Sequence, residues 1–181
     1  VPGFDLPGIL TSDGVLGLEV LPKSILLVGG GVIGIEFASI FSALGVEVTV
    51  VEMLPEILPN LDVELVGYLR QILEARGIRF LTSATVKSVR ALGSGYATAV
   101  TAGVEEEIVT EKVFVCTGRR PFTQGLGLEE IGVRTDRGRI AVDERMRTSV
   151  PGIHAIGDCA SPIMLAHVAS AEGEVAAEAI M

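Results

Sequence analysis

Three glycines carry the clearest chemical signal in this sequence. Gly29, Gly31 and Gly34 have the spacing G-x-G-x-x-G, between an apolar run at residues 25–28 and a segment of helical pattern. In that setting the first glycine permits a sharp turn, the second lets a pyrophosphate approach the backbone, and the third lets helix and strand pack closely. The helix would present free N–H groups to the phosphates. The motif therefore predicts a dinucleotide site.

Glu52 completes this pattern at the end of the next predicted strand, about 20 residues after the third glycine, as such sites require. A carboxylate there can accept hydrogen bonds from both ribose hydroxyls of an adenosine. It would repel a 2′-phosphate, which carries a charge of about −1.5 to −2. Residues 53–60 contain no Lys or Arg that could bind such a phosphate. We therefore predict NAD as the cofactor, not NADP.

Two further positions follow apolar runs in the same way. Gly118 comes directly after the run at 113–116, where the other end of a bound dinucleotide would lie, although it could equally be a turn glycine before a basic loop. Asp158 follows the run that ends at Ile156. Its carboxylate could hold a polyol hydroxyl or cap the next segment, and the pattern alone leaves both open.

The elements that must position these residues alternate regularly from residue 24. A strand at 25–28, a helix at 35–44 closed by Gly45 and a strand at 46–51 have the length of one βαβ unit. A helix is predicted at 62–76 and a strand at 78–81. The helix has Leu65, Leu69, Ile72 and Leu73 on one apolar face.

The hydrophobic period then changes to that of short strands. Runs at 85–90, 96–101 and 105–110, separated by glycine-containing breaks, predict an antiparallel three-stranded meander before a last parallel strand at 113–116. The fold class is therefore α/β, with a Rossmann-like parallel sheet and the meander inserted in it. Later segments are predicted as strands at 139–142 and 152–156 and a helix from residue 163.

We expect three regions along the chain. Residues 1–22 are rich in Gly and Pro and form a connector with one helical turn around 12–18, residues 23–119 form the dinucleotide-binding domain, and residues 120–181 form a truncated remainder. The last region is too short for a substantial core of its own, so we assign it to a neighbouring domain. Both ends of the chain are interpreted as cut from a longer polypeptide.

Composition excludes several classes of partner. The 181 residues contain 14 Lys plus Arg and 23 Asp plus Glu, a net charge of −9 that disfavours nucleic acid and anionic membranes. No uncharged apolar run reaches the roughly 20 residues of a spanning helix. Residues 1–3 begin neither the basic nor the apolar segment of a signal peptide, and we expect a cytoplasmic protein. Cys116 and Cys159 have no metal-ligand spacing and are predicted to be buried free thiols, and no metal site is predicted.

The motifs together closely resemble one family, the dihydrolipoamide dehydrogenases, which belong to the flavin- and NAD-dependent disulfide oxidoreductases. The resemblance runs collinearly through nearly the whole chain. Its matching segments are residues 29–36, 50–52, 57–59, 118–121, 125–128, 137–140, 150–153, 155–158 and 164–167.

The resemblance implies a role for each matching position. The NAD pyrophosphate loop corresponds to Gly29, Gly30, Gly31, Val32, Ile33, Gly34, Ile35 and Glu36, with Glu52 as the adenosine ribose acid, Val86 as the contact on the adenine side and Gly118 as the contact near the nicotinamide. The FAD site corresponds to Asp158, which binds the ribityl and phosphate region, and to Met164, Leu165, Ala166 and His167, which run under the flavin ring.

The resemblance also implies what this chain lacks. The family reacts through a Cys-x4-Cys pair, preceded by an FAD-binding glycine motif, and through a C-terminal His-Glu pair, none of which is present. Cys116 and Cys159 occupy positions where the family usually has small apolar residues, so we assign them no redox role. His154 and His167 are interpreted as non-catalytic. We expect no catalytic residue in this segment, and an inert chain when it is alone.

By resemblance, the parent enzyme oxidises a dihydrolipoyl group on a carrier protein and passes the electrons through FAD to NAD⁺. The expected partners are the rest of the FAD domain, a C-terminal interface domain through which the full-length enzyme forms a homodimer, and the lipoyl carrier. Two alternatives remain. The segment could come from a mercuric, glutathione-type or coenzyme-A disulfide reductase or an NADH oxidase, or it could be a non-enzymatic NAD-binding module.

Overall fold

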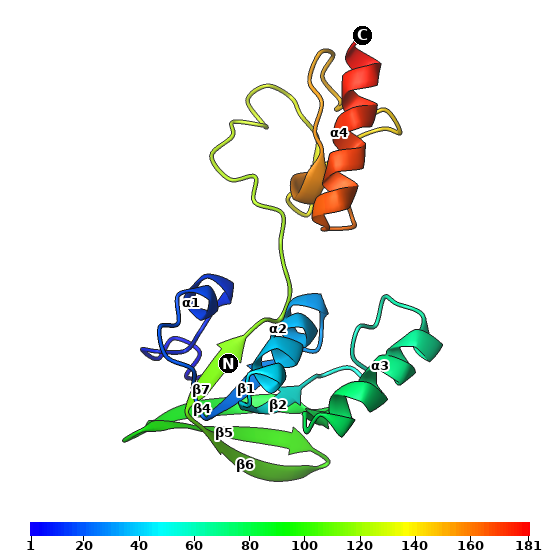
Figure 1. Cartoon of the computed structure of the whole chain (residues 1–181). Helices are drawn as coiled ribbons and strands as arrows, with labels where there is room; N and C mark the ends of the chain where they lie inside the picture. The colour runs from blue at the N-terminus through cyan, green and yellow to red at the C-terminus, as the bar shows by residue number, and fades with distance from the viewer. The chain divides into compact units, whose positions relative to one another are not determined.

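The computed structural model describes residues 1–181, which divide into two compact units (Figure 1). The first unit comprises Val1–Gly118 and the second Arg119–Met181. No helix in either unit combines the length and the apolar character needed to cross a bilayer. The two units are described separately below.

A four-stranded parallel sheet forms the centre of the first unit. Its strand order is β3-β2-β1-β7, with the strands at Arg79–Leu81, Glu47–Val51, Ser24–Val28 and Lys112–Val115 respectively. Val28 pairs with Val51 on one side and with Val115 on the other, so these three strands end at the same edge. The continuous apolar run of β1 is explained by its position, because both faces of a central parallel strand are buried.

Two layers cover the sheet, helices on one face and an antiparallel sheet on the other (Figure 1). Side chains alternate between the faces with the period of a strand. Ile25 and Leu27 pack in the core beneath α1 (Ser12–Leu16), α2 (Val32–Ala43) and α3 (Val63–Ala75). Leu26 and Val28 pack in a second core against the meander. The predicted α/β class with an inserted meander is confirmed.

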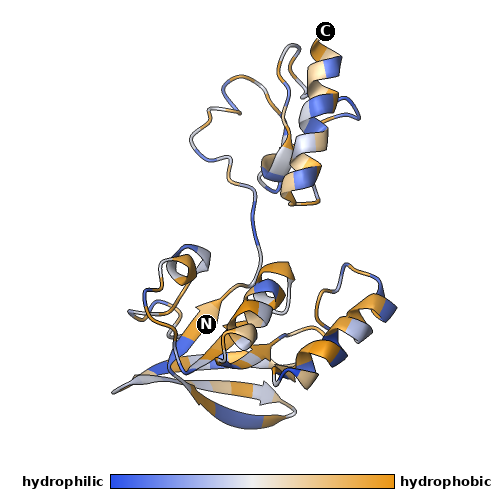
Figure 2. Ribbon diagram, viewed as in Figure 1, coloured by the Kyte–Doolittle hydropathy of each residue, from blue (hydrophilic) through white to orange (hydrophobic).

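The meander consists of β4 (Thr85–Leu92), β5 (Gly95–Ala102) and β6 (Val104–Thr110), in that order. β6 forms one edge of this sheet and carries Glu105, Glu106 and Glu107, the hydrophilic stretch visible in Figure 2. Glu106 pairs with Arg79 at 2.8 Å and Glu107 with Arg90 at 2.9 Å. The acidic run is therefore partly neutralised by one arginine of β3 and one of β4.

α2 begins earlier than the sequence pattern indicates. Gly31 is its N-cap and the helix starts at Val32, three residues before the predicted start at Ile35. The predicted start lies too far along the chain because the last residues of the glycine motif already form the first turn of the helix. The helix ends at Ala43, one residue before the predicted end, with Leu44 as its C-cap and Gly45 next in the left-handed region at φ 81°.

The buried face of α3 differs from the predicted one. Val66 and Leu73 are buried and Leu69 packs against the same core, whereas Leu65 is 68% exposed and Ile72 51% exposed. The helix carries two apolar stripes, and only the packing against the sheet decides which of them is covered. Leu65 and Ile72, which the pattern places on one apolar face with Leu69 and Leu73, therefore lie outside the core.

Residues 1–22 pack onto the first unit. Leu10 N–H donates to Val113 O at 2.8 Å, and Val115 N–H donates to Leu10 O at 2.9 Å, so Leu10 extends the parallel sheet by one bridge beside β7. Val15 of α1 is buried in the core on the helical face. This stretch, predicted as a connector, is thus part of the hydrophobic core of the first unit.

The second unit contains little regular structure besides its last helix. Its elements are β8 (Thr135–Asp136), β9 (Arg139–Ile140), a 3₁₀ turn at Gly157–Cys159 and α4 (Ala166–Ile180). A small core of its own contains Val133, Ile140, Ala155 and Ala160.

Three element predictions in the second unit need correction. Residues 152–156 form no strand, only a single bridge between Arg147 and His154, because the preceding chain turns at Met146 with φ 59°. Asp143 stabilises this turn by accepting from the backbone of Arg147 and Arg145, which lowers the pKa of its carboxyl. The strand at 139–142 ends at Ile140, and the helix starts at Ala166, not at 163.

We predict that Asp62→Ala lowers the free energy of unfolding by about 1 kcal/mol. Asp62 is the N-cap of α3, and its Oδ1 accepts from Glu64 N at 3.0 Å and from Leu65 N at 3.2 Å. Urea denaturation monitored by circular dichroism measures the change. Thr11→Ala is the control, because Thr11 caps α1 without a side-chain hydrogen bond; it should change stability by less than about 0.5 kcal/mol. Equal effects of the two variants would contradict the capping role.

Candidate nucleotide-binding site

The glycine motif forms a tight connection between β1 and α2. Gly29 has φ 117°, and a Cβ atom on it would lie 2.7 Å from Cys116 O. A Cβ on Gly34 would lie 2.1 Å from Gly29 O. Neither position can hold a side chain, so the helix starts against the end of the strand.

Gly31 differs from the other two glycines because it faces open space. A Cβ atom there would meet nothing within 4 Å, and its φ of −76° is one that any residue adopts. Packing within the chain therefore does not require a glycine at this position. The open space at the head of α2 is what a phosphate group would need in order to reach the backbone.

The N-terminus of α2 has no side-chain cap and no acidic residue in its first turn. Ile35 N–H donates to Gly31 O at 2.9 Å, the first hydrogen bond of the helix, and the earlier amides have no side-chain acceptor. Unpaired amides and the helix dipole favour an anion at this end. Within the predicted loop, Gly34 and Ile35 are buried, whereas Val32 and Glu36 are exposed.

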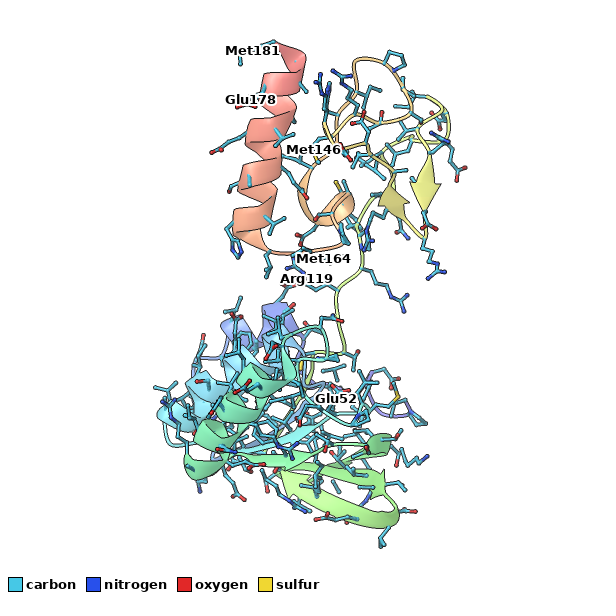
Figure 3. The ribbon with its side chains drawn as sticks, turned by 90° about the vertical axis from the view of Figure 1, so that its right-hand side faces the viewer. Glu52, Arg119, Met146, Met164, Glu178 and Met181 are labelled. Carbon is cyan, nitrogen blue, oxygen red and sulfur yellow. The ribbon has the colours of Figure 1, made fainter.

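Glu52 lies beside this loop, half-buried at the carboxyl end of β2 (Figure 3). Its Oε2 accepts from Gly30 N at 2.6 Å and its Oε1 from Leu54 N at 2.8 Å. The predicted acid is thus held on the backbone of the glycine loop itself. Each carboxylate oxygen can accept a second hydrogen bond, so ribose hydroxyls can still bind.

Two more predicted contacts belong to the first unit. Ala84 N–H donates to Glu52 O at 2.9 Å, which joins the start of β4 and therefore Val86 to the same edge. The Val86 side chain is buried in the second core. Gly118 has φ 117° and no atom within 4 Å of a Cβ position, two residues after Cys116 pairs with the end of β1.

Cys116 is buried under the glycine loop. Its Sγ lies 3.3 Å from Val28 O, and burial, with a smaller effect of the nearby Glu52 charge, raises the pKa of the thiol to about 12. The thiolate is the reactive form of cysteine, so this environment keeps the side chain inert. Cys116 is a buried free thiol as expected, whereas Cys159 is a free thiol that is only partly buried.

The predicted flavin-side residues all lie in the second unit. Asp158 forms an ion pair with Arg119, whose Nη1 donates to Met164 O at 3.4 Å, and Figure 3 shows Arg119 beside Met164. Asp158 and the stretch from Met164 are thus brought together through one arginine. α4 follows at Ala166 with no side-chain cap on its N-terminus, and His167 is exposed.

Sequence reasoning missed several residues that hold these sites in place. Leu54 and Ile57 contact the glycine loop or its acid, Arg119 pairs with Asp158, and Glu172 accepts from Gly157 N at 2.7 Å. For the Arg119–Asp158 ion pair, the one sequence signal was the pair of basic residues at 119 and 120. The other contacts are made across turns or by backbone amides, which no residue pattern reveals.

The arrangement of the first unit is that of α/β proteins that bind a dinucleotide at the carboxyl edge of a parallel sheet. Residues 1–173 match the family described as pyridine nucleotide-disulphide oxidoreductase, and the chain belongs to that family.

Curated relatives support this assignment with substantial identity. The chain is 47% identical over 164 residues to a dihydrolipoyl dehydrogenase of Thermus scotoductus, covering 88% of this chain and 36% of the relative. It is 43% identical to a dihydrolipoyl dehydrogenase of Rhizobium etli, covering 99% of this chain and 38% of the relative. The chain therefore spans well under half the length of these relatives.

Solved structures share the fold. The flavoprotein disulfide reductase RclA of Escherichia coli superimposes with a TM-score of 0.89 at 27% identity, covering all of this chain and 41% of RclA. LpdA of Mycobacterium tuberculosis superimposes with a TM-score of 0.86 at 33% identity, covering 96% of this chain and 38% of LpdA.

We predict that substitution by alanine has different effects at two glycines of the loop, on stability at Gly34 and on NAD affinity at Gly31. Gly34→Ala should lower the free energy of unfolding by about 1–3 kcal/mol, because its Cβ would overlap Gly29 O. Gly31→Ala should change stability by less than about 0.5 kcal/mol but weaken NAD binding about tenfold. Denaturant unfolding and titration calorimetry measure the two effects. A Gly31→Ala chain that binds NAD normally would remove the open position from the site.

We predict that Cys116 resists alkylation in the folded chain at pH 8. Its raised pKa leaves the thiol protonated there, while Cys159 is only partly covered. Because the folded pKa lies above the unfolded one, this thiol supports folding at neutral pH and loses that contribution as the pH rises toward 12. Mass spectrometry after iodoacetamide treatment should find Cys159 modified first. Equal modification of both thiols without denaturant would contradict the inert assignment.

Proposed function

We propose that this chain is the NAD-binding segment of a flavin-dependent dihydrolipoyl dehydrogenase, with adjoining parts of the FAD domain. In this proposal residues 23–119 form a Rossmann-like NAD domain, and residues 120–181 are part of the FAD domain. NAD⁺, when bound, supplies the hydride acceptor of the reaction. The role of this chain is to bind and orient that cofactor.

One observation carries the proposal: an open, uncapped helix start at Gly31 lies beside a carboxylate held on Gly30 N–H. The diphosphate of NAD fits the open side of the loop, where α2 offers unpaired amides. An acid at the end of the next strand then fits the adenosine ribose. We assign the cofactor contacts to Gly29, Gly30, Gly31, Val32, Ile33, Gly34, Ile35, Glu36, Glu52, Val86 and Gly118.

The residues of the second unit fit an FAD site in part. Asp158 would hold the ribityl and phosphate region, and Met164, Leu165, Ala166 and His167 would run under the flavin ring. Arg119 neutralises Asp158, so its carboxylate is aligned but already paired. We propose that the remainder of the FAD domain completes this site, and that the chain alone has no catalytic residue.

The proposed partners follow from the length of the relatives. Because the chain spans 36% and 38% of the two dihydrolipoyl dehydrogenases above, the rest of the FAD domain and a C-terminal interface domain would complete the enzyme. The complete enzyme would be a homodimer that acts on a lipoyl carrier protein. We place it in the cytoplasm, because both cysteines are free and a reducing compartment keeps thiols unpaired.

A second candidate is the equivalent segment of another flavoprotein disulfide reductase. The high TM-score to RclA favours it, but the identity to RclA is 27%, against 47% to the Thermus dihydrolipoyl dehydrogenase. The fold is common to both classes of enzyme, and the higher sequence identity supports dihydrolipoyl dehydrogenase as the first candidate.

We predict that Glu52→Ala weakens NAD binding by about tenfold to a hundredfold, since a hydrogen bond to a charged group contributes about 1.5–3 kcal/mol. Titration calorimetry of the 181-residue chain with NAD measures this change. Glu47→Ala is the matched control, because Glu47 is an exposed acid at the opposite end of the same strand. Unchanged affinity in Glu52→Ala would remove the carboxylate from the site.

The same residue tests the choice of cofactor. Glu52→Arg should shift the preference toward NADP, because the substitution replaces repulsion of the 2′-phosphate with attraction. The ratio of the NADP and NAD dissociation constants is the measured quantity. A variant that keeps the original ratio would contradict the assignment of Glu52 to the adenosine ribose.

A further inference from the structure

The loop after Glu52 is attached to the glycine loop at two points. Leu58 N–H donates to Gly30 O at 2.9 Å. The Ile57 side chain is fully buried, and its Cγ2 would lie 2.9 Å from a Cβ atom on Gly30. Gly30 in turn donates its N–H to Glu52 Oε2 at 2.6 Å. Residues 57 and 58 therefore fix the position of Gly30, whose carbonyl accepts from Leu58 and whose N–H orients the Glu52 carboxylate.

Arg70 of α3 holds the residue that precedes these two. Its Nη1 donates to both carboxylate oxygens of Glu56, at 3.0 and 3.2 Å, and Glu56 Oε1 also accepts from Ile57 N at 2.9 Å. On its other side, Arg70 Nε donates to Glu74 at 2.9 Å, and the guanidinium lies 5.7 Å from the centre of the Phe80 ring.

These contacts distinguish Arg70 from the other arginines of the first unit. Its side chain is 24% exposed, whereas that of Arg90, paired with Glu107, is 61% exposed. The hydrogen bond to Glu74 and that to Glu56 raise the pKa of Arg70 against the opposing effect of burial, so the guanidinium stays charged. Ion pairs at exposed sites contribute little to folding stability. A half-buried arginine that bonds to two acids is instead held in one position.

We propose that Arg70 is a positioning residue for the nucleotide site: by holding Glu56 it keeps Ile57 and Leu58 against Gly30 and so sets the Gly30–Glu52 hydrogen bond. The connection runs without a gap from the guanidinium to Glu56, Ile57, Gly30 and the Glu52 carboxylate. Arg70 touches no ligand in this scheme. The expected effect of Arg70 on NAD affinity rests on the proposed function. The expected effect of Arg70 on the position of residues 57 and 58 does not.

The position also bears on the choice of cofactor. Residues 53–60 contain no Lys or Arg, and Arg70 is the basic residue whose contacts lead into that loop. Two carboxylates already neutralise it. The arginine therefore stabilises the adenosine side of the site without offering a free positive charge to a 2′-phosphate.

The first test measures NAD affinity of the 181-residue chain by titration calorimetry in Arg70→Met, which keeps an apolar stem against Phe80. We expect a dissociation constant about threefold to tenfold higher, and a similar rise in Glu56→Gln. Arg70→Lys should restore part of the loss. Arg90→Met is the matched control, an ion pair on the meander with no contact to the loop, and should bind NAD normally.

A double-mutant cycle separates positioning from general stabilisation. If Arg70 acts through Glu52, Arg70→Met should raise the dissociation constant less than about twofold in a Glu52→Ala background. The same fold-change in both backgrounds would mean that Arg70 acts independently of the acid and would overturn the proposal.

A second measurement needs no ligand. Gly30 and Leu58 amides should exchange hydrogen about tenfold faster in Arg70→Met than in Arg90→Met, at equal global stability. Unchanged exchange together with normal NAD affinity would overturn the proposal. A wild-type chain that fails to bind NAD would contradict the proposed function. Faster exchange in Arg70→Met would still support the proposal that Arg70 holds Ile57 and Leu58 against Gly30.

Discussion

The hydrogen bond from Gly30 N–H to Glu52 is the constraint on which the candidate site depends. It joins the ends of two neighbouring parallel strands, and it exists only because Gly29 and Gly34 let α2 start against the end of β1. A side chain at either glycine would push the helix away and carry the loop with it. The parallel register of Val28 with Val51 places the partners opposite each other. The same residues therefore determine both the packing of α2 on the sheet and the geometry of the candidate site.

Much of the first unit could be predicted from hydrophobic period alone. The apolar run of β1 differs in pattern from the runs of β4 and β6 because β1 is buried on both faces and the outer strands of the meander on one. The choice of buried stripe on α3 could not be predicted. Val66 and Ile72 are both apolar residues of one helix, and only the shape of the sheet beneath it decides that the first is buried and the second is exposed.

The second unit illustrates the opposite case. Residues 152–156 have the composition of a strand but form only one bridge, because the turn around Met146 and the hydrogen bonds of Asp143 hold the chain in another path. In the candidate site, the types and spacing of Gly31 and Glu52 were enough to predict that both lie at the carboxyl edge of the parallel sheet. The contacts of Leu54 and Leu58 could not be predicted, since both use backbone amides that every residue possesses. Whether these residues hold a cofactor stays a prediction.

The acidic run on β6 has a consequence for how this chain behaves in concentrated solution. An edge strand offers unpaired backbone groups to any other strand, and the flanking Val104 and Val109 are exposed apolar residues that would favour such pairing. If two copies aligned along this edge, the charged groups of one copy would meet those of the other: Glu105 and the ion pairs that Glu106 and Glu107 form with arginines. Charged side chains on an edge strand work against pairing with a strand of another molecule, so this edge of the meander is disfavoured as a site of aggregation.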